Sequence, residues 1–388
     1  MMTLLARLVL SLLSIVWLTL STSAQEPDVA FDSKANYAIL IDAKSGAVFY
    51  EKNADVAVPP ASMTKLMTQA VVFDALKAGK LTNEQEMLVS EDAWRRGGSP
   101  AGGSTMYAEL NSRIKVIDLL RGAVIQSAND ACIVLAEGIS GSESAFMALL
   151  DAKAKELGMK NSTFRNSTGL PDPEHKMSVR DLSTVARYII QNHPDYFKLY
   201  GEPEFEWNKI KQSNRNPLLK DFPGADGMKT GYTREAGYGL VGTAMRDGRR
   251  LIMVVAGMET PSARKEESQK LLEFGFRQFK PIDVFEAGET VATARVWGGE
   301  QRWVDLVTVE AFKIALSAKE QDTVEVKLNY TGPLMAPVEK GARIGTVRIL
   351  VDGKTVAETP VVTSDAVAPI TSMWTKAFDS VLIMVFGS

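Results

Sequence analysis

Residues 237–258, GYGLVGTAMRDGRRLIMVVAGM, predict two antiparallel strands, because apolar runs flank Asp247-Gly248, a pair typical of tight β-hairpin turns. Residues 37–52, YAILIDAKSGAVFYEK, show the same pattern around residues 43–46. Helical patterns dominate the chain between these two hairpins. Strands, then many helices, then strands again predict an α+β fold, in which helices pack on an antiparallel sheet.

The helices are expected over 62–78, 116–158, 179–192 and 263–279. Gly79 and Gly158 are helix stop signals, and Pro194 follows the third helix closely. Residues 160–176, KNSTFRNSTGLPDPEHK, have the composition of a loop. The fold class is therefore an antiparallel sheet flanked by helices, with an all-helical subregion.

A second region begins near residue 281, where the helical period ends. Residues 323–328 alternate with period two, residues 346–351 do so less cleanly, and turns such as Asp352-Gly353 separate the runs. We expect a small all-β sandwich over 281–365. Because it lacks a cluster of catalytic residue types, a spacer or binding role is expected for it.

The last residues, 366–388, predict an amphipathic helix whose apolar residues recur at steps of three and four. Its terminal place, after a Pro-containing linker, and its Trp374 and Phe378 favour attachment to a membrane surface. Lys376 is its only cation, so binding would depend on apolar burial. A core or dimer helix is the alternative.

The N-terminus predicts export. Arg7 precedes an apolar run over 8–20, and Thr22-Ser23-Ala24 provides small residues for cleavage before Gln25. An uncleaved anchor is the alternative, but the run is shorter than the roughly 20 residues of a spanning helix. We therefore expect a signal peptide over 1–24 and a catalytic domain over 25–280.

The composition excludes several functions. Forty-four basic and 47 acidic residues give a net charge of -3, and no basic face suited to nucleic acid is evident. Cys132 is the single cysteine, so no intrachain disulfide can form, and its apolar neighbours indicate a buried residue. His175 and His193 lack the spacing of zinc ligands. We expect neither a metal nor a cofactor.

With histidine this scarce, a serine enzyme would need lysine as its base. In PPASMTKLMT, residues 59–68, Ser62 and Lys65 occupy positions i and i+3, which share one helix face. A free lysine has a pKa near about 10.4, so the base must be buried or must lie near a second cation. The alternative is a helix N-cap serine followed by a solvated lysine.

Two later tripeptides could complete such a site. Ser127-Ala128-Asn129 lies at a break between two apolar helical runs, where polar side chains can project into a cleft. Lys229-Thr230-Gly231 leads into the strand pair, and its glycine allows another backbone to approach. A turn and a surface charge are the alternatives for these two tripeptides. The order S-x-x-K, S-x-N, K-T-G is more specific than any single motif.

In ASMTKLMT, SANDAC and GMKTGYT the chain resembles the low-molecular-mass penicillin-binding proteins that act as D-alanyl-D-alanine carboxypeptidases. The signal peptide, β domain and terminal helix extend the resemblance. Ala128 stands where the family often has glycine, and Tyr232 where some relatives carry histidine. The deacylating glutamate motif of class A β-lactamases matches only residues 325–329, in the β domain, so efficient lactam hydrolysis is not expected.

The resemblance implies that Ser62 attacks a peptidoglycan stem peptide ending in D-Ala-D-Ala and that β-lactams acylate the same serine. Lys65 would be the base, and repulsion from Lys229 would keep it neutral. The other implied site residues are Ser127 and Asn129 for catalysis, and Lys229, Thr230, Gly231 and Tyr232 for substrate binding.

Arg264 could neutralise the substrate carboxylate, and the Gly-rich loop 97–104 lies near the site on this reading. The implied location is extracytoplasmic, at the outer face of the cytoplasmic membrane. An endopeptidase acting on cross-links and a non-catalytic cell-wall scaffold are the remaining alternatives.

Overall fold

The computed structural model describes residues 31–371. The predicted signal peptide lies outside these residues, and so does the predicted C-terminal helix from residue 372 onward. Residues 366–371, where that helix was predicted to begin, are not helical, because Val367 pairs with Val338 and Pro369 with Gly299.

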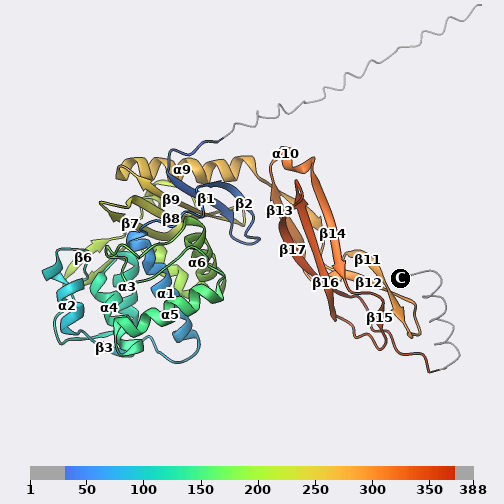
Figure 1. The fold of residues 1–388 in the computed structure, drawn as a ribbon, viewed down its shortest axis with the longest axis horizontal. Coiled ribbons are helices and arrows are strands. Elements are labelled where there is room, and N and C mark those ends of the chain that lie inside the picture. Colours follow the sequence, from blue (N-terminus) through green and yellow to red (C-terminus); the bar gives the residue numbers. More distant parts are fainter. Residues whose placement is uncertain (1–30, 372–388) are drawn as a thin grey trace, which may run out of the picture. The chain divides into compact units, whose positions relative to one another are not determined.

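Five strands form the central sheet (Figure 1). They follow the order β2-β1-β9-β8-β7, and all neighbours are antiparallel. Their bounds are β1 (Tyr37–Asp42), β2 (Val48–Lys52), β7 (Ala225–Thr233), β8 (Gly237–Arg246) and β9 (Arg249–Met258). Both predicted hairpins are confirmed. In the β8–β9 turn, Asp247 and Gly248 have φ angles of 50° and 76°, as a primed turn requires.

Both faces of this sheet are buried, because apolar residues fill both sides of its strands. Ile252 and Val254 pack with the core that contains α1, whereas Leu251 and Met253 pack with Leu271 and its neighbours. Figure 1 accordingly shows α9 on one face and the other long helices on the opposite face. These helices are α1 (Lys65–Lys77), α3 (Val116–Ile125), α4 (Asn129–Ser140), α5 (Glu143–Glu156), α6 (Val179–Asn192) and α9 (Pro261–Gln278).

Several short elements were not predicted, since segments of so few residues carry little periodicity. They are α2 (Glu91–Gly97), α7 (Pro194–Phe197), α8 (Leu218–Asp221), β3 (Glu86–Leu88), β4 (Arg113–Lys115), β5 (Glu204–Trp207) and β6 (Ile210–Ser213).

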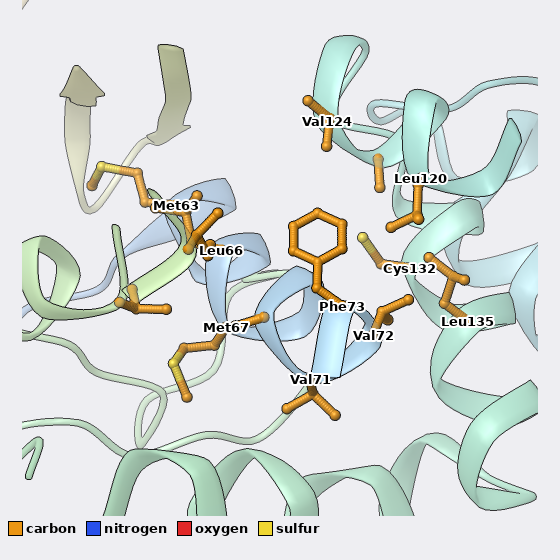
Figure 2. Close-up of a cluster of buried hydrophobic side chains, with 14 of the residues drawn as sticks. Met63, Leu66, Met67, Val71, Val72, Phe73, Leu120, Val124, Cys132 and Leu135 are labelled. Atoms are coloured by element: carbon orange, nitrogen blue, oxygen red, sulfur yellow. The ribbon is translucent and has the colours of Figure 1, made fainter. Parts of the chain in front are cut away.

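The first helix, α1, is buried over its first nine residues, 65–73. Figure 2 shows its apolar side chains pointing to several sides of the helix, among them Leu66, Met67 and Phe73. A helix that is apolar all round is a core helix. Cys132 lies in the same cluster with no exposed surface, which confirms the prediction of a buried cysteine.

The C-terminal region is all-β apart from one helical turn, α10 (Ala318–Gln321). A six-stranded sheet, in the order β14-β16-β17-β12-β11-β15, and the strand pair β10–β13 share one apolar core that includes Val296, Leu306 and Ile349. The strands are β10 (Lys280–Phe285), β11 (Thr290–Trp297), β12 (Trp303–Thr308), β13 (Phe312–Leu316), β14 (Val324–Tyr330), β15 (Leu334–Met335), β16 (Arg343–Val351) and β17 (Lys354–Thr363). The predicted all-β fold is confirmed.

Candidate active site

Ser62 lies in a short 3-10 helix, η1 (Ala61–Thr64), that runs directly into α1. The residue that caps η1 is Pro60, and no side chain caps it, so the N-cap alternative for Ser62 is wrong. Lys65 has no exposed surface, so the solvated-lysine alternative is wrong as well. The Nζ atom of Lys65 lies 2.9 Å from Ser62 Oγ, within reach for proton transfer.

The amine of Lys65 has three oxygen neighbours. Besides Ser62 Oγ, they are Asn129 Oδ1 at 2.8 Å and the Thr168 carbonyl oxygen at 2.6 Å. The amide and the carbonyl oxygen can only accept hydrogen bonds, so they take both N–H groups of a neutral amine. The nitrogen lone pair then points at the Ser62 hydroxyl. This geometry orients the amine as a base toward its one protic neighbour.

Burial and, to a smaller extent, the charge of Arg215 lower the pKa of Lys65 to about 8. A larger fraction of this amine is therefore neutral near pH 8 than for a lysine in water. Burial and a second cation were the two causes expected for such a base. Loss of solvation contributes more than any single neighbouring charge, and the cation that contributes is Arg215, whereas repulsion from Lys229 was expected.

Ser127 and Asn129 occupy the predicted break between α3 and α4. Ser127 has a φ of 62°, a left-handed conformation that is uncommon for serine, and its side chain is buried. Its Oγ accepts a hydrogen bond of 2.7 Å from Lys229 Nζ. Asn129 begins α4 and is hydrogen-bonded to Lys65, so the S-x-N motif contacts both lysines.

Lys229, Thr230 and Gly231 lie in β7, the edge strand of the sheet. Only 2% of Lys229 is exposed, so the surface-charge alternative is wrong. Burial holds the pKa of Lys229 well below its usual value, and a charge on Lys65 lowers it further. The two lysines therefore disfavour the state in which both carry a proton. A carboxylate held by Lys229 would keep the proton there and leave Lys65 neutral.

Gly231 lets η1 approach the strand, as its position in K-T-G predicted. A Cβ atom at this residue would lie 2.9 Å from the Pro60 carbonyl oxygen and 3.0 Å from Met63 Cγ. The next residue, Tyr232, is 53% exposed, and its ring stacks on Tyr238 at 4.1 Å. Gly231 therefore allows the short distance between η1, which carries Ser62, and β7.

Two functional features were not predicted. The Thr168 carbonyl is one, and no residue pattern marks a backbone oxygen. Arg215 is the other: it precedes α8, donates to Ser104 Oγ at 2.5 Å, and its charge lowers the pKa of both lysines. An isolated arginine in a loop carries no sequence signal.

Arg264, near the start of α9, is half-buried, and burial lowers its pKa. Its guanidinium lies 5.7 Å from the Tyr238 ring centre, and its buried Nε has no hydrogen-bond partner among the described residues. Its charge also lowers the pKa of Lys229. A buried donor whose charge also acts on Lys229 is suited to binding an anion.

The Gly-rich loop 97–104 adjoins the site, because the Ser104 carbonyl oxygen accepts a hydrogen bond of 2.8 Å from the Asn129 N–H. Within residues 31–371, no group of three or more His, Cys, Asp or Glu side chains could hold a metal ion. The site therefore contains the Ser62 hydroxyl, the weakly basic amine of Lys65, the Ser127 hydroxyl that accepts a hydrogen bond from Lys229, and the edge strand β7. Such a set is suited to acyl transfer through a serine ester.

Comparisons with known proteins agree with this chemistry. Residues 21–260 match a family model described as D-alanyl-D-alanine carboxypeptidase, and residues 279–369 match one described as penicillin-binding protein 5, C-terminal domain. The chain is 39% identical over 333 residues to D-alanyl-D-alanine carboxypeptidase DacC of Escherichia coli, covering 85% of this chain and 83% of that protein.

Solved structures resemble it as well. Penicillin-binding protein 5 of Haemophilus influenzae matches with a TM-score of 0.78 at 38% identity, over 87% of this chain and 98% of the other. Penicillin-binding protein D2 of Listeria monocytogenes, in its ampicillin-bound form, matches with a TM-score of 0.55 at 30% identity, over 64% of this chain and 99% of the other.

Proposed function

Because the chain belongs to the D-alanyl-D-alanine carboxypeptidase family, we propose that it removes the terminal D-alanine of peptidoglycan stem pentapeptides through an ester on Ser62. One observation carries the assignment of the nucleophile. The fully buried amine of Lys65 lies 2.9 Å from Ser62 Oγ, and its two other neighbours are acceptors.

In the first step Ser62 Oγ attacks the carbonyl carbon of the penultimate D-alanine, and its proton passes to Lys65 Nζ. The N–H groups of Ser62 and Tyr232 would hold the oxyanion, where donors act only as charge develops. The C–N bond then breaks, and the Ser127 hydroxyl passes a proton to the leaving amine. Ser127 is reprotonated at the expense of protonated Lys65, so the proton taken from Ser62 leaves with the D-alanine and Lys65 is neutral again. Lys229, Thr230 and Arg264 hold the substrate carboxylate in this scheme.

In the second step water attacks the ester and gives a proton to Lys65, which passes that proton to Ser62 Oγ as the C–O bond of the ester breaks. Asn129 orients Lys65 through the 2.8 Å hydrogen bond. A β-lactam contains an amide and a carboxylate in a similar arrangement, so it would enter the same first step. The relative solved in an ampicillin-bound form supports this expectation.

The test is the mass of the intact protein after incubation with benzylpenicillin, together with D-alanine release from a pentapeptide. We expect one adduct, located on Ser62 and lost in Ser62→Ala. A protein that neither forms the adduct nor releases D-alanine would refute the proposed function. Labelling that persists without D-alanine release would favour the scaffold alternative, and rapid loss of the label would favour a β-lactamase.

An endopeptidase would use the same residues on D-Ala cross-links. Parallel digestion of cross-linked and monomeric muropeptides distinguishes the two activities. We expect the monomeric pentapeptide to be consumed faster. Faster loss of the cross-linked substrate would assign the endopeptidase activity instead.

We also propose that the protein is exported and attached to the outer face of the cytoplasmic membrane. The proposed parts are a signal peptide over 1–24, a catalytic domain over 25–280, a β domain over 281–365 and a membrane-association helix within the remaining C-terminal residues. The apolar run 8–20 and the amphipathic pattern after Pro369 support this proposal.

Among residues 31–371, no single helix is long and apolar enough to cross a bilayer; only α4 and α5 taken together, bent by 85°, meet that criterion. Sedimentation with membranes tests the terminal helix. The full chain should pellet, and a chain ending at Ala368 should not. Equal sedimentation of both would refute the attachment.

A further inference from the structure

The turn over residues 166–170, which carries the Thr168 carbonyl, is held by one side chain. Asn166 Oδ1 accepts hydrogen bonds from the N–H groups of Thr168, Gly169 and Leu170 at 3.2, 2.7 and 3.1 Å, and from Thr168 Oγ1 at 3.0 Å. Asn166 Nδ2 donates to the Leu170 carbonyl oxygen at 3.0 Å. The side chain is buried and uses both ends of its amide within the turn. Asparagine stabilises turns in this way because its amide replaces backbone partners.

Further hydrogen bonds join this turn to α1 and α5. Ser167 donates from its N–H and its Oγ to Glu143 Oε1 at 2.8 and 2.6 Å. Thr68, one helical turn after Lys65, donates to the Ser167 carbonyl oxygen at 2.7 Å. The turn therefore cannot move independently of the helix that carries Lys65.

The turn also lies directly against η1. Gly169 has a φ of 80°, and a Cβ atom there would lie 1.9 Å from the Ala61 carbonyl oxygen. Only glycine allows this approach, which brings the Thr168 carbonyl to the amine of Lys65.

We propose that Asn166 is a positioning residue for the base: it holds the Thr168 carbonyl at the place where that oxygen directs the Lys65 lone pair toward Ser62. The inference rests on the proposed function. If the Thr168 carbonyl moved, one N–H of the neutral amine would lose its acceptor. The amine could then rotate and donate to Ser62 Oγ instead of accepting its proton.

The test measures the second-order rate constant of acylation by benzylpenicillin in the full-length protein, from about pH 6 to about pH 10, a range that spans the titration of a buried lysine. The variants are Asn166→Ala, which removes the acceptor, and Asn166→Asp, which retains an oxygen for the same four donors. Asp172→Ala is the matched control, because Asp172 supports a neighbouring turn of the same loop through a 2.8 Å hydrogen bond to the Glu174 N–H. Within residues 31–371, Asp172 makes no hydrogen bond or ion pair with Lys65.

We expect Asn166→Ala to lower the acylation rate constant between about 10- and 100-fold, the effect of a misplaced catalytic group. Its rate should also rise at lower pH than in the wild type, because the ammonium form of Lys65 loses an acceptor. Asn166→Asp should retain the rate to within about threefold, with the rise moved to higher pH by the added negative charge. Asp172→Ala should match the wild type.

An unchanged rate and pH profile in Asn166→Ala would overturn the inference. It would also be overturned if both Asn166 variants lost activity only in proportion to folded protein, with the profile unmoved. If Asn166→Ala does not fold, the profile of Asn166→Asp decides, and an unmoved rise there overturns the inference. A wild-type protein that forms no adduct would refute the proposed function, which is a distinct result.

Discussion

Replacing Gly231 by alanine tests the contact between η1 and the edge strand β7. The backbone of Gly231 has an ordinary negative φ, so alanine is allowed there and the only cost is steric. The new Cβ would lie 2.9 Å from the Pro60 carbonyl oxygen, 3.0 Å from Met63 Cγ and 3.3 Å from Ala61 Cβ. Met63 can change rotamer, but the Pro60 carbonyl belongs to the backbone that leads into Ser62. We therefore expect η1 to move away from β7 by a few tenths of an ångström.

This displacement should cost more activity than stability. Overpacking of this kind destabilises a protein by about 1–3 kcal/mol. A displacement of 1 Å can lower a rate by 10²-fold, so a smaller shift of Ser62 should slow acylation by about 10-fold. The movement separates the N–H of Ser62 from the N–H of Tyr232, which are the two proposed oxyanion donors. The distance between Lys65 and Ser62 should change little, because η1 and α1 are continuous and move together.

Acylation by benzylpenicillin and thermal unfolding, measured on the same preparation, provide the assay. Gly201→Ala is the control, because its Cβ would lie 3.4 Å from the Asp226 carbonyl oxygen, an ordinary van der Waals distance. Gly201→Ala should acylate as the wild type does. If Gly231→Ala acylated at the wild-type rate in fully folded protein, the close approach would have no part in catalysis, and the reasoning would fail.

Three other predictions concern the buried lysines. The rate of acylation should increase with pH and level off above about pH 8, because only neutral Lys65 can accept the proton from Ser62. A rate that does not change between about pH 6 and about pH 9, the range in which a buried lysine titrates, would contradict Lys65 as the base. Folding lowers the pKa of Lys65 from 10.5 to about 8, so between these two pH values the unfolded chain binds more protons than the folded protein. The free energy of unfolding should therefore rise with pH across this range, by about 3 kcal/mol relative to Lys65→Met, as measured by urea unfolding. A difference between the two proteins that stays constant with pH would contradict the shift. Lys229→Met should move the rise in acylation to higher pH and increase the KM for a pentapeptide, and steady-state kinetics that show neither effect would remove Lys229 from both roles.

Much of the fold was predictable, because long elements carry strong local signals. The helix over 179–192 was placed correctly at both ends, since Ser178 caps it and Pro194 follows it closely. The two hairpins were found through their turns. The pairs β3–β4 and β5–β6 were missed, because their strands have only three or four residues. The partners β3 and β4 are far apart in the chain, and the β5–β6 turn, Asn208-Lys209, lacks the glycine that usually follows asparagine in such turns.

The site residues likewise include some that the sequence predicted and some that it did not. Side-chain motifs could be recognised, so Ser62, Lys65 and Lys229 were predicted before their contacts were known. The sequence indicated burial or a second cation as the cause of the low basicity of Lys65 but could not decide between them, since burial depends on residues from several elements that no local pattern describes. The Thr168 carbonyl and Arg215 were missed, because every residue has a carbonyl and a lone loop arginine resembles any surface arginine.

The buried cations have a consequence for neighbouring proteins. Within residues 31–371, Lys65 and Lys229 form no ion pair, so the counter-ion for Lys229 must arrive with the peptide that is to be cut. A bond inside a polypeptide has no carboxylate one residue beyond it and brings no such charge. Other exported proteins would therefore not be cleaved at their internal peptide bonds, although Ser62 itself does not distinguish one amide from another.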